Sequence, residues 1–394
     1  METKKLNIGL FIDSWFPMVD GVINVVDNYA KRLNKLANVT VFAPKARGEY
    51  DPSGLSYNLV QCKSAKVFFL DYDLPLPQFD KNFKKVLKNA QLDIIHVHSP
   101  FTIGKSAVKY GKKHNIPIIS TMHSQFEKDF FKATKSKCLT KLCLKVIMSV
   151  FNKSDLCLTM NPACVQLLKR YGCKTKIEIM PNATDFVPFE NPEQIKQQIY
   201  QKYNIPQDCK LFVNVGRLDT IKNIDFVLDV CQVLKNKGFK FKQIIVGGGK
   251  DEQKFKLKAQ SLGIQDDVVF TGKIFDKTEL SKIYQASSLH VFPSFYDTDG
   301  IVRIEASTFG VPTIFIKDSI ASSTILDDVN GYIGENDKEK FAQKIIDIFN
   351  DDQHYQTVRQ NCHKDLYITW DDLTKKVLDV YTKVIQEKNK CKKI

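Results

Sequence analysis

Residues 210–230, KLFVNVGRLDTIKNIDFVLDV, combine three features that together predict the fold. The first is a short apolar run typical of a buried strand, and the last is a segment in which apolar residues recur at helical spacing. Between them lies a basic turn that carries Arg217 and Lys222. Strands that alternate with helices in this way form parallel sheets with helices on both faces.

The same alternation runs through two successive series of strands. The first series comprises NIGLFI, VTVFAP, DIIHVH, IPIIST and LCLTM, and the second comprises KLFVNV, QIIVGG, VVFTG, LHVFPS and PTIFI. A stretch rich in proline and polar residues, 187–208, separates the two. One core organises about 250–300 residues at most, and this chain has 394. We therefore predict an α/β protein with two doubly wound domains, residues 1–187 and 188–372. A final helix over residues 373–394 is expected to return to the first domain.

The formal charge of +14 indicates an anionic partner, which could be a nucleic acid, a membrane surface or a phosphorylated substrate. A composition biased toward lysine is the alternative explanation. No helix-turn-helix, zinc or aromatic RNA-binding motif accompanies the basic residues, which argues against nucleic acid. The ten cysteines form no CxxC pair and are expected to be reduced thiols. No run of 18 apolar residues predicts a membrane-spanning helix, and the first residues lack the pattern of a signal peptide.

In open parallel sheets, ligands bind at the loops that follow the carboxyl ends of the strands. Arg217 and Lys222 occupy such a loop beside a helix start, where two cations suit a diphosphate. A solvated basic turn is the alternative. A glycine turn at 247–249 would let backbone approach a ligand, although it lacks the spacing of a dinucleotide site. Gly21 opens a helix after the first strand and is either a structural turn or a substrate contact.

The segment FPSFYDTDGIVRIEAS, residues 292–307, allows two interpretations. Asp297 and Asp299 form an Asp-x-Asp triplet that could hold a divalent metal on a nucleotide diphosphate. Alternatively, Asp297 and Glu305 act as a pair of acids, eight positions apart, at the junction of a strand and a helix.

Taken in order, these elements resemble those of a known enzyme family. GRLDTIKN resembles the Arg-x4-Lys element of the retaining GT-B glycosyltransferases, and FPSFYDTDGIVRIEASTFGVPTI resembles their Glu-x7-Glu element. The match of strand, basic turn, glycine turn, VVFTG and acidic element extends over nearly all of residues 205–335. In the first half, residues 93–130 are similar to the acceptor domain of the family, especially in enzymes that glucosylate diacylglycerol in bacterial membranes.

The resemblance implies a GT-B fold, in which two Rossmann-like domains face each other across a cleft and the second binds most of the sugar nucleotide. His123 corresponds to a histidine beside the donor sugar. Asp297 corresponds to the acid that binds sugar hydroxyls, and Glu305 to the acid that binds the ribose. Asp297 stands where the family normally has glutamate, which leaves the sugar open. His96 and His98 alternate along one predicted strand, so we expect them to face opposite sides, with only His98 near the site.

The resemblance also implies how the donor is activated. Arg217 and Lys222 offset the charge of the leaving diphosphate, so no metal cofactor is expected. The anomeric configuration is retained by same-face attack, with the leaving phosphate accepting the proton of the acceptor. Further contacts to the donor are expected from Gly21, Gly300, Ile301 and Val302.

Residues 134–153, TKSKCLTKLCLKVIMSVFNK, predict an amphipathic helix. Lys137, Lys141 and Lys145 recur every four residues along one stripe. The apolar side chains expected on the opposite face are Leu139, Leu142, Val146 and Val150. Such a helix can lie on an anionic membrane, and an ordinary domain helix with a solvated lysine face is the alternative. The apolar, proline-rich segment 67–79 is a second candidate for contact with a lipid acceptor, or a cap on the sheet.

The leading hypothesis is a cytoplasmic enzyme, peripheral on the inner face of the cell membrane, that transfers a hexose from a UDP-sugar to a lipid. Glucose is the expected sugar and diacylglycerol the expected type of acceptor. The same fold could instead glycosylate a soluble or polyprenyl-linked glycan during the synthesis of surface polysaccharide. A nucleic-acid-binding protein is the remote alternative.

Overall fold

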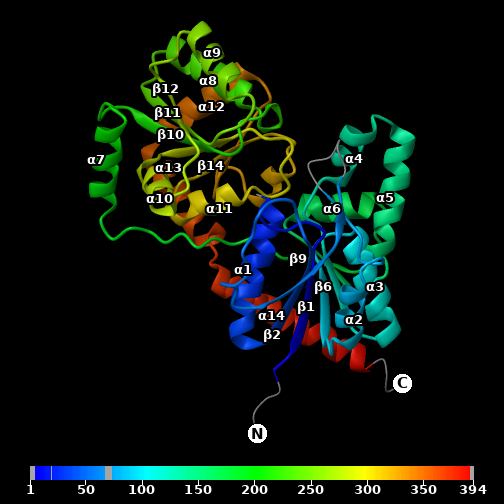
Figure 1. The fold of residues 1–394 in the computed structure, drawn as a ribbon. Helices are drawn as coiled ribbons and strands as arrows, with labels where there is room; N and C mark the ends of the chain where they lie inside the picture. Colours follow the sequence, from blue (N-terminus) through cyan, green and yellow to red (C-terminus); the bar gives the residue numbers. More distant parts are fainter. Residues whose placement is uncertain (1–4, 19, 67–72, 391–394) are drawn as a thin grey trace. The chain divides into compact units, whose positions relative to one another are not determined.

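Two compact units make up the chain (Figure 1). The computed structural model describes residues 5–18, 20–66 and 73–390. The first unit contains Met1–Asn182 together with Trp370–Ile394, and the second contains Ala183–Thr369. Part of the segment 67–79, residues 67–72, lies outside the described residues, so its predicted contact with a lipid acceptor stays a prediction.

The first crossing between the units lies after Asn182, not after residue 187 as the proline-rich stretch suggested. The backbone N–H of Thr184 donates to the carbonyl of Ile368 at 3.0 Å, which fixes the two crossing segments to each other within the second unit. The last helix, α14 (Trp370–Lys390), begins at Trp370 and not at residue 373. Trp370 packs edge-on against Tyr29 of the first unit, with ring centroids 5.6 Å apart, and this contact explains the earlier start.

A seven-stranded parallel sheet forms the centre of the first unit, in the order β3-β2-β1-β6-β7-β8-β9. Its strands are the short apolar runs that the sequence indicated. They are β1 (Asn7–Phe11), β2 (Asn38–Pro44), β3 (Asn58–Cys62), β6 (Ile94–Val97), β7 (Ile118–Thr121), β8 (Leu156–Thr159) and β9 (Ile177–Ile179). A short antiparallel pair is separate from this sheet and consists of β4 (Ser64–Ala65) and β5 (Leu74–Pro75).

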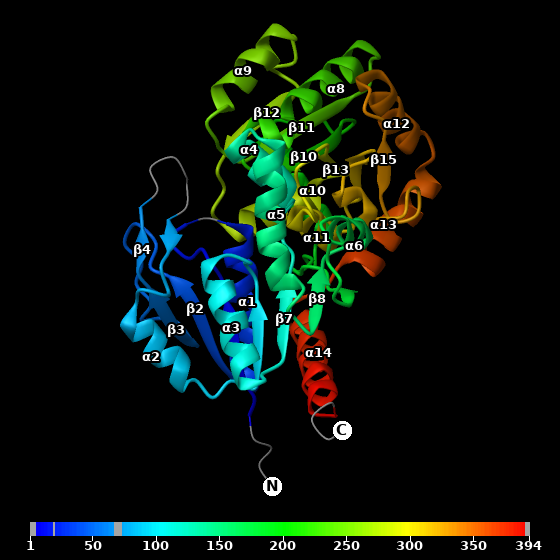
Figure 2. The ribbon, with the colours of Figure 1, turned by 90° about the vertical axis from the view of Figure 1, so that its right-hand side faces the viewer.

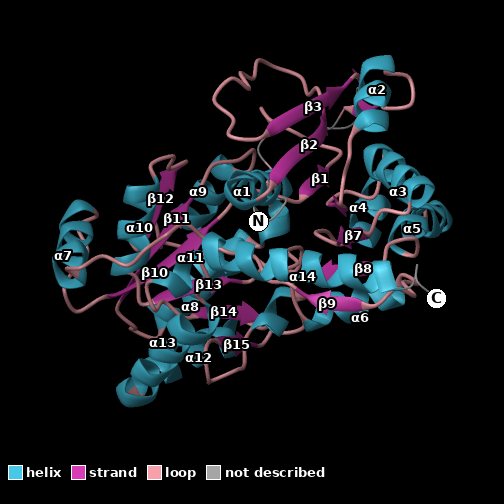
Figure 3. Cartoon of the chain, turned by 90° about the horizontal axis from the view of Figure 1, so that it is seen from below, coloured by secondary structure: helices cyan, strands magenta, loops and turns pink. Residues whose placement is uncertain are grey.

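Helices cover both faces of this sheet. Besides α14, the helices of the described residues are α1 (Gly21–Leu36), α2 (Lys81–Asn89), α3 (Thr102–His114), α4 (Phe126–Thr134), α5 (Lys137–Phe151) and α6 (Pro162–Arg170). Figure 3 shows α2, α3 and α5 on one face and α1 and α14 on the other. Side chains fix where helices begin: Asp80 accepts from the amide of Phe83 at 3.0 Å, and Asn161 accepts from that of Cys164 at 2.9 Å.

The second unit has a six-stranded parallel sheet in the order β12-β11-β10-β13-β14-β15 (Figure 2). Its strands are β10 (Lys210–Val215), β11 (Phe241–Val246), β12 (Val268–Gly272), β13 (Leu289–Phe292), β14 (Thr313–Ile316) and β15 (Tyr332–Gly334). Its α-helices are α7 (Pro192–Lys202), α8 (Ile224–Asn236), α9 (Glu252–Ser261), α10 (Lys277–Ala286), α11 (Ile301–Thr308), α12 (Lys338–Asn350) and α13 (Asp352–Leu366). Two 3-10 helices, η1 (Thr220–Lys222) and η2 (Ala321–Thr324), complete it.

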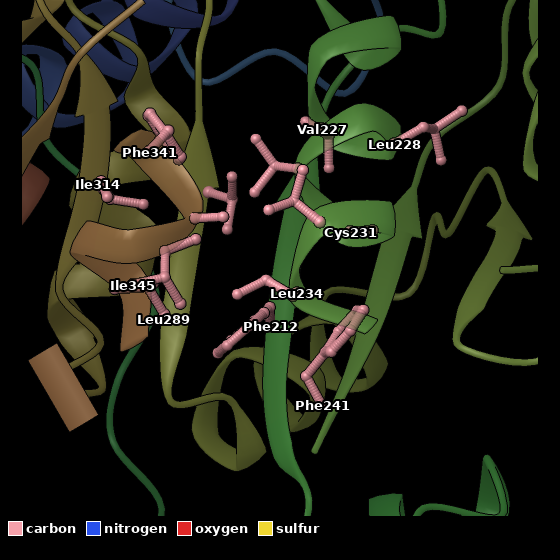
Figure 4. Packing of buried hydrophobic residues seen from close by; sticks show 14 of the residues in the cluster. Phe212, Val227, Leu228, Cys231, Leu234, Phe241, Leu289, Ile314, Phe341 and Ile345 are labelled. Carbon is pink, nitrogen blue, oxygen red and sulfur yellow. The ribbon is translucent and has the colours of Figure 1, made fainter. Parts of the chain in front are cut away.

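Alternate residues of the central strand face two separate cores. Phe212 of β10 packs with residues of α8 and α12 (Figure 4), whereas Leu211 and Val213 pack with residues of α7, α10 and α11. Successive side chains of a strand point to opposite faces of the sheet. A run such as KLFVNV is therefore buried on both sides, as expected for a parallel sheet covered by helices.

In both sheets the chain reverses direction beside its first strand. From β1 it moves outward to β3 and then returns to β6, which pairs with β1. From β10 it moves outward to β12 and then returns to β13, which pairs with β10. Open α/β sheets bind ligands at such reversal points, so the loops after β1, β6, β10 and β13 are the places to search for a site.

A buried hydrogen bond fixes helix α14 within the first unit. The hydroxyl of Tyr381 lies 2.6 Å from Nδ1 of His96, and Nε2 of His96 lies 2.6 Å from Oγ1 of Thr121. Burial lowers the pKa of His96 to about 3, so the ring is neutral at physiological pH. Both nitrogens of this buried ring therefore depend on hydroxyl partners.

Replacing Tyr381 with phenylalanine should lower the free energy of unfolding of the first unit by about 1–3 kcal/mol. The ring still fills its place, but a buried imidazole nitrogen loses its partner. Both tryptophans, Trp15 and Trp370, lie in this unit, so denaturation followed by fluorescence reports on it. Thr382→Ala, at an exposed position of the same helix, is the control and should change the value by less than about 0.5 kcal/mol. Equal stability of Tyr381→Phe and the wild type would contradict the expectation.

Candidate active site

Two loops of the second unit meet at the carboxyl ends of β10 and β13. Asn214 of β10 donates from Nδ2 to the carbonyl of Val291 in β13 at 2.7 Å. Asn223, whose φ of 58° is left-handed, donates from Nδ2 to the carbonyl of Pro293 at 3.1 Å. These bonds connect the basic turn after β10 to the acidic segment after β13. The two motifs that the sequence singled out thus lie together at the carboxyl ends of neighbouring strands of one sheet.

Lys222 and Asp297 join these loops in an ion pair. Nζ of Lys222 lies 2.6 Å from Oδ1 of Asp297, and the side chains are only 20% and 19% exposed. The lysine side chain passes close to Gly216, where a Cβ atom would lie 3.9 Å from its Cε. Because water shields the pair only in part, its attraction exceeds that of an exposed surface pair. An anionic ligand must compete with Asp297 for this ammonium group.

Arg217 is the exposed cation of the same turn. Its side chain is 65% exposed, and its Nε lies 2.6 Å from Oδ2 of the buried Asp219. A guanidinium has five N–H donors, so this contact through Nε leaves others that can bind a ligand. The predicted pair of cations is therefore present, one in an ion pair with the acidic segment and one directed to solvent.

The glycine turn after β11 supports the basic turn. A Cβ atom on Gly247 would lie 1.8 Å from the carbonyl oxygen of Gly216, and one on Gly249 would lie 2.1 Å from that of Leu218. The N–H of Leu218 donates to the carbonyl of Gly248 at 3.2 Å. The absence of side chains at Gly247 and Gly249 thus lets the two turns approach each other, and the predicted approach of the glycine turn to a ligand stays a prediction. The glycines act on the site through the loop that they hold.

Asp297 and Asp299 have separate cationic partners. Oδ1 of Asp299 accepts from Nη2 of Arg303 at 3.0 Å, and both of these side chains are almost entirely buried. Asp297 faces Lys222. Among the residues that the structure describes, no group of three or more His, Cys, Asp or Glu side chains could hold a metal ion. The two acids of the Asp-x-Asp triplet therefore face different cations, and the expectation that no metal is needed stays a prediction.

Helix α11 starts directly after the acidic segment. Gly300 precedes its first residue with a φ of 71°, and a Cβ atom there would lie 2.9 Å from the ring of Phe292, so glycine is required. The cap residue makes no side-chain hydrogen bond, and the first turn contains no acidic residue. Amides at the start of a helix attract anions, so Ile301 and Val302 lie where a phosphate group would be favourable.

Glu305 follows on the same helix, beside Tyr284 of α10. The Tyr284 hydroxyl donates to Oε2 of Glu305 at 3.0 Å. Burial raises the pKa of Glu305 to about 7, and the hydrogen bond from Tyr284 and the charge of Lys277 offset this only in part. The carboxyl group therefore changes its charge close to neutral pH. The sequence indicated Glu305 but not Tyr284, because no local spacing relates the two helices.

Three histidines gather at the carboxyl ends of β6 and β7 in the first unit. Nδ1 of His98 lies 3.1 Å from Nε2 of His123, and the ring centroids of His96 and His98 are 3.9 Å apart. The expectation that His96 and His98 face opposite sides is wrong, since residues two apart along a strand share a face. Burial lowers the pKa of each ring, that of His123 to about 4. All three are neutral near pH 7.

Asp13, which no motif indicated, fixes the helix that starts beside these histidines. It follows β1 and accepts hydrogen bonds from the N–H of Ile103 at 2.7 Å and of Gly104 at 3.3 Å, and from the hydroxyl of Thr102 at 3.1 Å. Burial raises the pKa of Asp13 to about 6 despite these bonds. In the sequence, Asp13 could have been found from its position directly after the predicted strand NIGLFI.

Gly21 is the first residue of α1, which Asp20 caps by accepting from the N–H of Val22 at 2.7 Å. Apart from its chain neighbours and the backbone of its own helix, no atom of the described residues lies within 4 Å of the place where a Cβ atom would stand. Packing therefore does not require glycine here. The predicted contact of Gly21 with the donor stays a prediction.

Helix α5 exposes lysines and apolar side chains on one surface. Lys137, Lys141 and Lys145 are exposed, and the described ion pairs include none of them. Apolar residues are exposed as well: Leu139 is 49%, Leu142 is 57% and Val146 is 41% exposed. Val150 is buried. Of the four apolar residues predicted to lie opposite the lysine stripe, three are therefore exposed and one is buried.

An open pocket of about 400 Å³ lies between this helix and the turn after α6. Lys141, Lys145 and Arg170 contribute three basic side chains to it, and Tyr171 and Asn152 contribute polar groups. Nη2 of Arg170 also lies 3.0 Å from Oε2 of Glu127. The pocket is thus basic, with the exposed apolar residues of α5 on the same helix.

Two family models match successive parts of the chain. Residues 19–186 match the model described as Glycosyltransferase Family 4, and residues 195–365 match the model described as Glycosyl transferases group 1. The first range covers most of the first unit apart from α14, and the second covers most of the second unit.

Proteins of known function and structure are similar to the chain over most of its length. Alpha-monoglucosyldiacylglycerol synthase from Streptococcus pneumoniae is 28% identical over 98% of this chain and 87% of its own. The protein of the same name from Acholeplasma laidlawii is 23% identical over 90% of this chain and 91% of its own. The crystal structure of Anabaena HepE in complex with UDP and glucose superposes with a TM-score of 0.73 at 16% identity, over 96% and 99% of the two chains.

These matches confirm the predicted GT-B fold and the prediction of an enzyme, a hexosyltransferase with a nucleotide-sugar donor. The chain belongs to the GT-B glycosyltransferases, with a family 4 domain followed by a group 1 domain.

Proposed function

We propose that the protein transfers glucose from a UDP-sugar to diacylglycerol or a closely related lipid at a membrane surface, with retention of the anomeric configuration. Arg217, Lys222 and the start of α11 lie at the carboxyl ends of β10 and β13, and this observation carries the proposal. These three sources of positive potential suit the diphosphate of a nucleotide sugar. Glucose and the lipid acceptor are supported by the names of two relatives that are similar to this chain over nearly its full length.

The basic turn and the helix start supply the stabilisation that bond cleavage needs. Breaking the bond between the sugar and the phosphate leaves negative charge on the diphosphate. Arg217 and Lys222 face that charge as fixed cations, and the amides of Ile301 and Val302 add the positive end of a helix. Such groups act most strongly where they are held in place before the reaction, and the hydrogen bonds of the two loops hold them.

The two acids of the segment after β13 bind different parts of the donor, Asp297 the sugar and Glu305 the ribose. When the diphosphate binds Lys222, it takes the place of Asp297 beside the ammonium group, and Asp297 can then accept hydrogen bonds from sugar hydroxyls. Glu305 accepts from the ribose hydroxyls in its ionised form. His123 contributes a polar contact to the sugar. The acceptor hydroxyl attacks the anomeric carbon from the face that the diphosphate leaves, and a diphosphate oxygen takes its proton.

The acceptor is proposed to reach the enzyme from a bilayer. Helix α5 offers three lysines without ion-pair partners among the described residues, and beside them Leu139, Leu142 and Val146. Lysines attract anionic headgroups, and exposed apolar side chains can enter the interfacial layer. None of the helices in the described ranges has both the length and the apolar character to cross a bilayer. The enzyme is therefore proposed to bind peripherally, on the inner face of the cell membrane.

The decisive experiment incubates the purified protein with labelled UDP-glucose and other UDP-sugars in the presence of vesicles that contain diacylglycerol. We expect a glucosylated lipid with the α-configuration, formed at an undiminished rate in excess chelator, because fixed cations replace a metal. Strict dependence on manganese would restore the metal role of Asp297 and Asp299. A product formed only on a polyprenyl-linked or soluble glycan would replace the lipid proposal with the glycan alternative.

Replacing Arg217 with alanine should lower kcat by about 10²- to 10³-fold while the protein stays folded. Removal of one charge-stabilising group costs about 2–4 kcal/mol in the transition state. Initial rates with UDP-glucose and circular dichroism measure the two effects. Lys237→Ala, an exposed lysine elsewhere in the same unit, is the matched control. An Arg217→Ala enzyme with the kinetics of the control would remove this residue from the site.

The affinity for uridine should rise as the pH increases from 6 to 8. The pKa of Glu305 is raised to about 7, so the carboxyl is mostly protonated at pH 6 and mostly ionised at pH 8, and the ribose hydroxyls bind the ionised form. The expected fall in Kd is up to about tenfold. Uridine carries no phosphate that titrates in this range, and calorimetry measures its Kd. In Glu305→Gln the dependence should vanish, and a flat profile in the wild type would contradict the assignment.

Replacing Lys137, Lys141 and Lys145 together with glutamine should lower the partition coefficient onto anionic vesicles by about two orders of magnitude at low salt. Each lysine contributes about 1 kcal/mol near an anionic surface. The control replaces Lys109, Lys112 and Lys113 of α3 with glutamine. These lysines are also exposed, and their replacement removes the same net charge. Hydrolysis of UDP-glucose by water should persist in both variants. Equal losses in the two variants would show that net charge, not helix α5, drives the binding.

A further inference from the structure

Tyr284 of α10 is a buried tyrosine whose hydroxyl reaches the acid of α11. Its side chain is 0% exposed, and its ring stacks on that of Phe309, with centroids 6.2 Å apart. The rings of Phe186 and His290 enclose it at 6.1 Å and 6.2 Å. The hydroxyl donates to Oε2 of Glu305 at 3.0 Å. Burial raises the pKa of Tyr284 well above its ordinary value, so the hydroxyl stays protonated and acts as a donor near neutral pH.

The carboxyl of Glu305 keeps one oxygen that is open to a ligand. Oε2 accepts from Tyr284, whereas Oε1 has no hydrogen-bond partner among the described residues and is not shut off from solvent. Glu305 lies one helical turn after Ile301, so the two side chains share a face of α11, about 6 Å apart along its axis. An open acceptor thus lies one turn from the amides that suit a phosphate group, which is where the ribose of a nucleotide would follow its diphosphate.

The groups that face Glu305 act on its charge in opposite directions. Burial disfavours the ionised carboxyl and raises its pKa to about 7, whereas the hydrogen bond from Tyr284 and the charge of Lys277 favour ionisation. The side chain of Lys277 is 72% exposed, and its Nζ lies 3.6 Å from Oδ2 of Asp185. Water and this acid weaken the effect of the lysine. Tyr284 is therefore the main group that opposes the effect of burial.

The other basic groups near α11 have partners away from Glu305. Arg303 of the same helix pairs with Asp299 at 3.0 Å. Nδ1 of His363 in α13 lies 3.2 Å from a backbone carbonyl of α11, and Nε of Arg359 donates to a carbonyl of the following turn at 2.9 Å. A change at Tyr284 should therefore appear directly in the ionisation of Glu305.

A purely structural role would not require a carboxyl as the acceptor. Tyr355, in the same unit, donates its hydroxyl to the backbone carbonyl of Ser288 at 2.7 Å. A buried tyrosine hydroxyl is thus satisfied without an ionisable partner. In contrast, the bond from Tyr284 is spent on a carboxyl whose ionisation burial opposes.

We infer that Tyr284 is a positioning residue that holds the carboxylate of Glu305 by Oε2 and so presents Oε1 to a hydroxyl of the ribose. A hydrogen bond to an ionised acceptor is stronger than one to a neutral acceptor, so the same contact extends the range of binding toward lower pH. The inference rests on the proposed binding of the ribose by Glu305.

The link between Tyr284 and Glu305 can be tested without a ligand. Carbon-detected NMR of the full-length protein, labelled with 13C-glutamate, follows the carboxyl signal that disappears in Glu305→Gln. In Tyr284→Phe the ring keeps its packing but the ionised carboxyl loses a donor, so the midpoint of this titration should move to higher pH by about one pH unit. Tyr355→Phe, which removes a tyrosine hydroxyl elsewhere in the unit, is the matched control and should leave the midpoint unchanged. An unchanged midpoint in Tyr284→Phe would overturn the inference.

A second measurement needs no replacement of Tyr284. In the wild type labelled with 13C-tyrosine, the Cζ signal of one buried tyrosine should shift with the midpoint of Glu305, because the strength of its hydrogen bond changes as the carboxyl ionises. The shift should disappear in Glu305→Gln. A wild-type protein in which no tyrosine signal follows this midpoint would also overturn the inference.

Binding of uridine separates the inference from the proposed function. We expect the Kd of uridine at pH 7 to be about fivefold higher in Tyr284→Phe than in the wild type, and the difference to narrow at pH 9, where both carboxyls are ionised. A loss of the same size at both pH values would indicate structural damage and would overturn the positioning role. If the NMR midpoint moves but the Kd of uridine is independent of pH in every protein, the link of Tyr284 to Glu305 stands and the proposed ribose contact fails.

Discussion

The ion pair between Lys222 and Asp297 is the contact on which the candidate site of the second unit depends. It joins loops from two neighbouring strands and holds opposite charges close together at their carboxyl ends. In the proposed mechanism, the lysine exchanges its carboxylate partner for a phosphate group of the donor. The aspartate would then be available to sugar hydroxyls, so that binding of the diphosphate and binding of the sugar would be coupled in one site.

The backbone around this pair is arranged so that little has to move. Gly247 and Gly249 let the turn after β11 press directly on the basic turn, at distances that no side chain would allow. Asn214 and Asn223 tie the same turn to β13 from the other side. Charged groups stabilise a transition state most when they are oriented beforehand. The glycines thus hold the basic turn in place, and their predicted close approach to a ligand stays a prediction.

The features that could be predicted from sequence are those encoded locally. A strand, a basic turn and a helix follow one another within residues 210–230, so the positions of Arg217 and Lys222 follow from the pattern of the chain itself. Glu305 could be predicted for the same reason, because it follows Asp297 by eight positions within one segment. Contacts between distant segments could not be predicted: Asp13 accepts from the amide of Ile103, about ninety positions later in the first turn of α3, and Tyr381 reaches His96 from the end of the chain. The side assigned to His96 was an error of reasoning, because a period of two places alternate residues on one face.

The net charge of the chain is a weaker guide to its partners than the local arrangement of that charge. Many lysines of the second unit lie beside acids, among them Lys235, Lys240 and Lys254, each within 2.8 Å of an aspartate oxygen. Their positive potential is largely compensated at close range, so they contribute to the formal charge but little to attraction at a surface. The three exposed lysines of α5 have no such partner in the described parts of the chain, and apolar side chains lie next to them. Such a combination favours binding to a bilayer, because anionic headgroups attract the ammonium groups while the apolar side chains enter the interfacial layer. Exposed leucines contribute nothing to the binding of a nucleic acid. Helix α5 therefore favours a membrane as the partner and argues against the nucleic-acid-binding alternative, which the net charge alone left open.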